Sequence, residues 1–346
     1  MTLRSVLAGL LRLCIAAALV LASGELVMRR YCYSPRVLDP DFGFVPAGNP
    51  TICKKEGDGV GHWGKRGIRR SPGRPAGASN ILVLGDSLTE AEQVDDDQTF
   101  THLLEARLVA EGRPYAVLNA GIEGLALPYY VEAAPAYERA FSPRWTIVAI
   151  SADDVAGSAF SAIATHFVKN PDGTLGLKAN PPVGRGGPVR QFVRYARAHS
   201  ALLQNYVLQY EGYARSVRAF RPFVATKKKD DPPLSHPERF PVREELSMLE
   251  ERFQGRVTIL FFSGFRPEDP DEESPMGRAI LDICAAEGWS CRSTREFSRQ
   301  FAASGTAPAG FPNSGFNWGH LNTAGHAAVA ALLDDEVRRL GERGLL

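Results

Sequence analysis

The sequence lacks an excess of charge of either sign. Its 40 Lys and Arg residues stand against 39 Asp and Glu residues, which leaves a formal net charge of +1 at pH 7. Long runs of like charge, which mark solvated interaction tails, are also missing. The sequence therefore offers no electrostatic case for a nucleic-acid partner.

Cysteine is scarce, with 5 residues in 346. The cysteines and histidines do not cluster at metal-ligand spacing, so no metal site is expected. Cys14 lies in an apolar segment, and an even set of four remains: Cys32, Cys53, Cys284 and Cys291. Two disulfides in an oxidising compartment would use all four. Proximity suggests the pairs Cys32–Cys53 and Cys284–Cys291, although four unpaired thiols fit the sequence as well.

The longest apolar segment is at the N-terminus. Residues 5–23 are interrupted only by Arg12 and follow the basic Arg4, a pattern typical of an export signal. Val20-Leu-Ala22 resembles a cleavage site for a removed signal peptide over residues 1–28. Alternatively, the apolar stretch continues to Met28, which gives the ~20 residues that span a bilayer. We favour the retained anchor, because Arg12 is close enough to one end to reach the interface.

Residues 29–79 are rich in Gly, Pro and Arg and show no sustained period. They predict an irregular N-terminal extension that wraps the following domain. Its basic cluster is expected to form a solvated face: Lys65, Arg66, Arg69 and Arg70.

From residue 80 onward, strand, turn and helix patterns alternate. Ile81 to Leu84 is a continuous apolar run of strand-forming residues, as in a strand that is buried on both faces. Further strands are expected at 115–120, 146–151, 256–263 and 289–292, with amphipathic helices between them. This order predicts an α/β fold with a doubly wound, mostly parallel five-stranded sheet flanked by helices. No glycine-rich dinucleotide fingerprint follows the first strand, and no nucleotide, flavin or other cofactor is expected.

Residues 157–245 interrupt the alternation. A turn-rich piece is followed by a helical piece near 189–220 and a charged loop. An insertion of this size after a sheet strand is expected to lie over the carboxyl ends of the strands, as a cap or a partner surface.

Two side chains with catalytic chemistry follow these elements. Ser87 lies on the turn from the first strand into a helix, at the sheet edge where α/β proteins bind ligands. It is a candidate nucleophile at a helix N-terminus, although serine is also a favoured helix cap. His320 lies in the loop before the last helix, at the same edge, and is the candidate general base.

These residues belong to four ordered blocks. Gly85-Asp86-Ser87-Leu88 resembles the first block of the SGNH, or GDSL, hydrolases, and Asn119 to Gly124 resembles the second. Asn317-Trp-Gly-His320 is similar to the last block, and Ala152-Asp153-Asp154 takes the place of the third. The resemblance covers residues 80–340 and implies an SGNH/flavodoxin-like three-layer sandwich over 80–346, with the insertion at 157–245.

The resemblance implies acyl transfer. Ser87 would attack an ester carbonyl, and His320 would take the proton and return it to the leaving alcohol. Backbone N–H groups of Ser87 and Gly124 would hold the oxyanion. His326, inside the start of the last helix, is expected to make a structural hydrogen bond.

Two positions depart from the family pattern. Asp153 stands where the family has an oxyanion-donating Asn, and its charge would oppose the developing negative charge. Asn317 stands where the family has the Asp that orients the histidine; an amide can orient the imidazole but does not stabilise its charged form.

Two hypotheses follow. The first is an exported, membrane-anchored ester hydrolase or O-acyltransferase, on the periplasmic or extracellular side. Its substrate would be an ester-bearing small molecule, or an acyl or acetyl ester of envelope polysaccharide or lipid. The second is a catalytically impaired relative that serves as a binding or assembly module.

Overall fold

The structure is a computed structural model of the 346-residue chain. It describes residues 3–48, 56–69, 77–156, 165–178, 192, 195–196, 198–204 and 236–346. The helical piece expected near 189–220 therefore lies largely outside the described residues.

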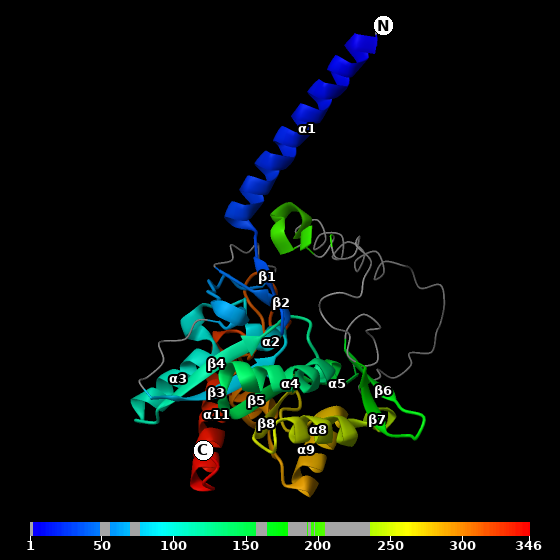
Figure 1. The fold of residues 1–346 in the computed structure, drawn as a ribbon. Coiled ribbons are helices and arrows are strands. Elements are labelled where there is room, and N and C mark those ends of the chain that lie inside the picture. The colour runs from blue at the N-terminus through cyan, green and yellow to red at the C-terminus, as the bar shows by residue number, and fades with distance from the viewer. Residues whose placement is uncertain are drawn as a thin grey trace, which may run out of the picture.

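A five-stranded, fully parallel sheet forms the centre of the molecule (Figure 1). Its strands follow the order β4-β3-β5-β8-β9. The chain enters the sheet at β3, adds β4 on one side, and then adds β5, β8 and β9 in turn on the other side. The bounds are β3 Ser79–Gly85, β4 Tyr115–Gly121, β5 Pro143–Ser151, β8 Val257–Phe262 and β9 Ser290–Ser293. The doubly wound sheet predicted from the sequence is confirmed, with each strand close to its expected position.

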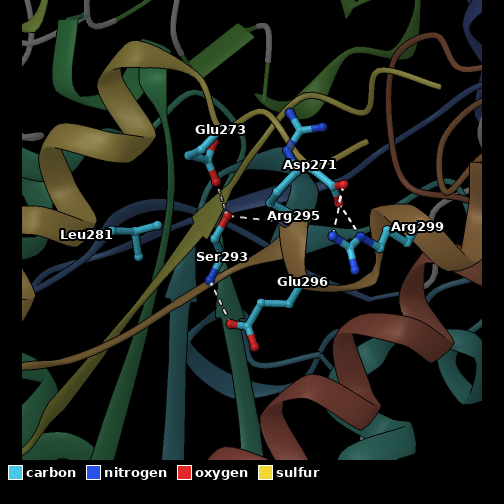
Figure 2. A pocket seen from close by; sticks show the side chains of 7 residues that line it. All are labelled: Asp271, Glu273, Leu281, Ser293, Arg295, Glu296 and Arg299. Atoms are coloured by element: carbon cyan, nitrogen blue, oxygen red, sulfur yellow. Dashed lines mark hydrogen bonds and ion pairs between the residues drawn. The ribbon is translucent and has the colours of Figure 1, made fainter. Parts of the chain in front are cut away.

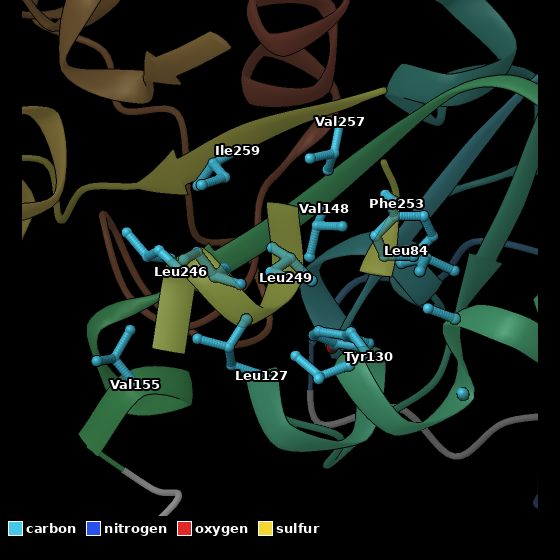
Figure 3. Packing of buried hydrophobic residues seen from close by; sticks show 14 of the residues in the cluster. Leu84, Leu127, Tyr130, Val148, Val155, Leu246, Leu249, Phe253, Val257 and Ile259 are labelled. Carbon is cyan, nitrogen blue, oxygen red and sulfur yellow. The ribbon is translucent and has the colours of Figure 1, made fainter. Parts of the chain in front are cut away.

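Helices cover both faces of this sheet. The larger helices are α3 Phe100–Ala110, α4 Leu127–Phe141, α8 Val242–Arg252, α9 Pro275–Glu287 and α11 Thr323–Glu342. Alternate residues of each strand enter opposite cores. Leu82 and Leu84 pack with α4 and α8, as Figure 3 shows for Leu84, whereas Ile81 and Val83 pack with α3 and α11. Because both faces are buried, the three central strands contain unbroken apolar runs: Ile81–Leu84, Ile147–Ile150 and Ile259–Phe262.

Short elements connect these layers or stand beside them. The short helices are α2 Ser87–Glu90, α5 Ala152–Ala156 and α10 Ser298–Ser304. Single 3-10 turns are η1 Lys65–Gly67, η2 Asp96–Gln98, η5 Pro237–Arg239 and η6 Thr294–Phe297. Two antiparallel hairpins lie outside the main sheet: β1 Arg36–Asp39 with β2 Gly43–Pro46, and β6 His166–Lys169 with β7 Leu175–Lys178.

The N-terminal helix α1, Leu3–Tyr31, extends away from the folded body (Figure 1). Over Arg4–Tyr31 its most apolar window has a mean hydropathy of 2.3, and none of that window is buried in the protein. By length and composition it is suited to cross a bilayer, and a signal sequence has the same properties.

The disulfide predicted between Cys284 and Cys291 is present, and it joins α9 to β9. Cys32 is also disulfide-bonded, while Cys53 lies outside the described residues. Cys14 is a free, exposed thiol on α1.

The prediction that the basic cluster of Lys65, Arg66, Arg69 and Arg70 forms a solvated face is wrong for Arg69. Arg69 is only 1% exposed. Its guanidinium pairs with Asp96 at 2.8 Å and donates to the backbone carbonyls of Glu90, Ala91 and Val94. A buried cation needs such partners, so Arg69 fastens the N-terminal extension to the chain that follows α2.

Candidate active site

Ser87 is the first residue of α2, directly after β3. The carboxylate of Asp86 caps this helix by accepting the N–H of Leu88 at 2.9 Å. A Cβ at Gly85 would collide with the side chain of Thr89, so glycine is required for α2 to turn back tightly over the end of the strand. The half-buried Ser87 hydroxyl is thereby held at the carboxyl edge of the sheet.

His320 comes from the other end of the chain, in the loop before α11. Its Nε2 lies 2.9 Å from the Oγ of Ser87, although the two residues are 233 positions apart. The loop ends firmly, because Asn322 caps α11 by accepting the N–H of Gly325 at 3.0 Å. The two residues singled out from the sequence thus meet in a direct hydrogen bond.

Glu56 completes this chain of hydrogen bonds. Its Oε2 lies 2.7 Å from the Nδ1 of His320 and also accepts the backbone N–H of His320 at 2.9 Å. The Glu56 side chain is only 10% exposed. Gly319 leaves room for this side chain, because a Cβ at that position would collide with the Glu56 carboxylate. Asn313 holds the neighbouring backbone: its side chain accepts the N–H of Gly57 at 2.8 Å and donates to the C=O of Gly57 at 3.1 Å.

Asn317 does not take the orienting position that the sequence suggested. Its side-chain amide donates to the backbone carbonyl of Phe265 at 3.0 Å, and its backbone is left-handed with φ 52°. The contact to the His320 imidazole comes from Glu56 instead, which restores the carboxylate that the last block lacks.

His326 has the structural role that was expected. It is buried and stacks on Phe100, with its Nδ1 3.3 Å from the N–H of that residue. Burial lowers the pKa of His326 to about 3, so this ring is neutral and can accept the bond.

The other oxyanion candidates lie on neighbouring turns. Gly124 has φ +76° in the turn between β4 and α4, which favours glycine. Asp153 is exposed in the first turn of α5, directly after β5. The next residue, Asp154, is buried and accepts the N–H and the hydroxyl of Ser151 at 2.6 and 2.8 Å. Burial, followed by the charge of Asp86, raises the pKa of Asp154 to about 7.

A second buried carboxylate joins these turns. Glu90, at the end of α2, is fully buried and pairs with Arg36 of β1 at 2.9 Å. Its other oxygen accepts the N–H of Glu123, next to Gly124. Burial raises the pKa of Glu90 to about 8, and the charge of Arg36 works against that shift. Helix α2, which begins at Ser87, and the turn that contains Gly124 are therefore linked through one side chain.

A separate pocket of about 350 Å³, lined mostly by charged residues, lies at the end of β9, between α9 and η6 (Figure 2). Glu273 accepts the hydroxyls of Ser263 and Ser293, both at 2.5 Å. Arg295 donates to the carbonyl of Gly264 at 2.7 Å, beside the Phe265 carbonyl that Asn317 contacts. The pocket contains neither Ser87 nor His320, and its hydrogen bonds hold the loop against which the last block rests.

Sequence reasoning missed Glu56, Arg36 and Glu90. Glu56 lies 264 positions from its partner, in a segment without periodicity, so no local pattern relates it to His320. The weak signal available was a glutamate before Gly57, in a sequence whose last block lacks the family's carboxylate.

No family model matches the chain. Among curated proteins, Esterase TesA of Pseudomonas aeruginosa is 45% identical over 49 residues, which are 14% of this chain and 24% of that protein. The chain thus spans about a quarter of the length of this curated relative.

Solved structures of esterases align more broadly at low identity. EstA from Pseudoalteromonas sp. is 12% identical, with 76% of this chain and 99% of that chain covered and a TM-score of 0.40. A TesA structure is 14% identical, with 76% of this chain and 99% of that chain covered and a TM-score of 0.41. A lipolytic protein of the G-D-S-L family from Veillonella parvula is 10% identical, with 73% of this chain and 95% of that chain covered and a TM-score of 0.36. The proteins that this chain resembles are thus esterases and a lipolytic protein of the G-D-S-L family.

Proposed function

We propose that the protein is a serine-dependent ester hydrolase or O-acyltransferase in which Ser87 is the nucleophile and His320 the general base. The observation that supports this best is the line of two hydrogen bonds from Ser87 Oγ to His320 Nε2, and from His320 Nδ1 to Glu56. Nucleophile, base and an orienting carboxylate in this order are the arrangement that acyl transfer requires.

In the first step, the Ser87 oxygen would attack the ester carbonyl while His320 takes the hydroxyl proton. The tetrahedral oxyanion would be held by the N–H groups of Ser87 and Gly124, each worth roughly 3–4 kcal/mol of transition-state stabilisation. As the intermediate collapses, His320 returns the proton to the leaving alcohol. Water or an acceptor hydroxyl would then take the acyl group from Ser87 by the same steps.

The carboxylate of Glu56 would stabilise the imidazolium that forms in each half-reaction. Its Oε2 accepts both the ring N–H and the backbone N–H of His320, so ring and loop are held together. With Glu56 in this position, Asn317 is not needed for orientation.

Asp153 would reduce the rate. It is exposed and ionisable at the end of β5, where a neutral amide would be the better oxyanion partner. Solvent weakens its repulsion, so a slowed rather than a silent enzyme is expected.

We further propose that α1 is a retained membrane anchor and that the site acts on the periplasmic or extracellular side. An exposed apolar helix of this length and a disulfide-bonded domain support export. The substrates would be acyl or acetyl esters of envelope polysaccharide or lipid.

Hydrolysis of nitrophenyl acetate by the full chain in detergent, from pH 5 to 9, tests the acyl-transfer site. Turnover should vanish in Ser87→Ala and rise in Asp153→Asn, by up to about 10²-fold if the new amide reaches the oxyanion. A wild-type rate equal to that of Ser87→Ala at every pH, not rescued by Asp153→Asn, would refute ester hydrolysis.

A further inference from the structure

The carboxyl end of α1 is joined to the folded body by specific polar contacts. Glu25 accepts the N–H groups of Ala201 and Leu202 at 2.9 and 3.0 Å, and the hydroxyl of Ser200 at 2.9 Å. Leu202 also packs against Gly24, where a Cβ would be in ordinary contact with it. A segment that is cut off after export would have no use for such a joint.

The chain that follows α1 runs directly onto the nucleophile helix. Three residues after the end of α1 at Tyr31, the Ser34 hydroxyl donates to Glu92 at 3.0 Å, and Arg36 pairs with the buried Glu90. Three extended residues reach at most about 11 Å, and α2 rises only ~1.5 Å per residue, so Ser87 lies within roughly 30 Å of the end of α1. In Figure 1, α1 leaves the body beside β1, β2 and α2, and the C-terminus lies at the opposite end.

Two large aromatic side chains are exposed on the catalytic loop. Phe316 is 67% and Trp318 60% exposed, and they precede His320 by four and two residues. Large apolar side chains held out in water beside a catalytic group mark an interaction surface. Tryptophan in particular favours the interface of a bilayer, where its ring is half in apolar surroundings and its N–H stays hydrated.

We propose that Phe316 and Trp318 dock the catalytic loop onto the bilayer that α1 crosses, so that the site takes esters carried by membrane lipids. This inference rests on the proposed function for its substrate, and on the anchor for its geometry. The side chain of His320 is 27% exposed, so a substrate ester that emerges from the interface has access to it.

The size of the aromatic pair favours a bilayer over a second protein. Fully exposed aromatic side chains offer about 150–250 Å² each, so at these exposures the pair presents roughly 250 Å². A stable protein interface needs about 800 Å² on each partner. Insertion of a few apolar side chains suffices for an anchored protein, because α1 already supplies the attachment.

Tryptophan fluorescence of the full chain in phosphatidylcholine vesicles tests the docking directly. α1 contains no tryptophan, and Trp63 and Trp145 are buried at 5% and 3% exposure. Lipids with brominated acyl chains should quench a substantial part of the wild-type emission. That part should be missing in Trp318→Phe and retained in the matched Trp289→Phe. Equal fractional quenching in wild type and Trp318→Phe would overturn the proposal. A wild-type protein that is a dimer, and that Trp318→Phe converts to a monomer, would also overturn it, because Trp318 would then contact a second copy of the chain.

The substrate class is tested by a ratio of rates. For the double variant Phe316→Ser, Trp318→Ser, the rate on a fatty-acyl ester embedded in the vesicles, divided by the rate on soluble nitrophenyl acetate, should fall at least fivefold. An unchanged ratio would refute lipid-borne esters as substrates. If Ser87→Ala abolishes neither rate, the proposed function is wrong. The quenching experiment still tests the docking of Trp318, because it does not depend on catalysis.

Discussion

Replacing Glu56 by Gln tests the part of the site that could not be read from the sequence. Glutamine keeps the size of the side chain and one acceptor oxygen, but it removes the negative charge beside the His320 imidazole. The protein should fold, because the Gly57–Asn313 hydrogen bonds and the space opposite Gly319 are unchanged.

The size of the effect follows from the two contacts that one oxygen makes. Glu56 Oε2 lies 2.7 Å from the ring nitrogen and 2.9 Å from the backbone nitrogen of His320, at a side chain that is 10% exposed. Charge-assisted hydrogen bonds of this kind contribute roughly 1.5–3 kcal/mol each. In other triads, exchange of the carboxylate for an amide lowers kcat by about 10⁴. We expect Glu56→Gln to lower kcat by roughly 10²–10⁴-fold, about 3–5 kcal/mol, with little change in KM.

Steady-state hydrolysis of nitrophenyl acetate measures this, with Asn317→Gly as the matched control. Glycine accepts the left-handed backbone of position 317, and the lost bond to the Phe265 carbonyl is not in the line to Ser87. The control should retain kcat within about threefold. If Glu56→Gln kept its rate while Asn317→Gly lost 10²-fold, Asn317 would be the orienting residue and the reasoning would be wrong.

Three further predictions concern the support of the site and the stability of the fold. Gly319→Ala places a methyl group against the Glu56 carboxylate, so kcat should fall at least tenfold while the circular dichroism spectrum stays native. An unchanged kcat would show that the loop around Gly319 shifts to accommodate the methyl group. Glu250 is buried with one unpartnered oxygen, and burial raises its pKa to about 7, so stability is lost as the pH rises from 4.5 to 7. Glu250→Gln should therefore raise the free energy of unfolding by up to about 3 kcal/mol at pH 8 and by less than about 1 kcal/mol at pH 5, and equal gains at both pH values would contradict this. Replacing Cys284 and Cys291 by Ser opens the loop between α9 and β9 and should lower the free energy of unfolding in urea by about 2.5 kcal/mol, and an unchanged value would show that this bond does not stabilise the fold.

The sheet and its helices could be read from the sequence because their signals are local. Ile81 to Leu84 and Ile259 to Phe262 are apolar runs, and such runs form strands that are buried on both faces where helices cover the sheet. Ser87 and His320 could be placed at one sheet edge because Ser87 follows a recognisable strand and His320 precedes a recognisable helix, and parallel strands present their carboxyl ends together. The Cys284–Cys291 pairing followed from proximity along the chain in the same way.

The partners of the site were decided by tertiary structure alone. Residues 29–79 have no period, so the sequence left Glu56 as an unremarkable acidic residue and Arg69 as part of a solvated cluster. Only the folded chain brings Glu56 to His320 across 264 positions, and it buries Arg69 against the backbone carbonyls around the end of α2. Local propensity determines which elements form, because it acts over a few neighbouring residues. The position of an aperiodic segment depends on long-range hydrogen bonds and buried charges, which no local pattern encodes.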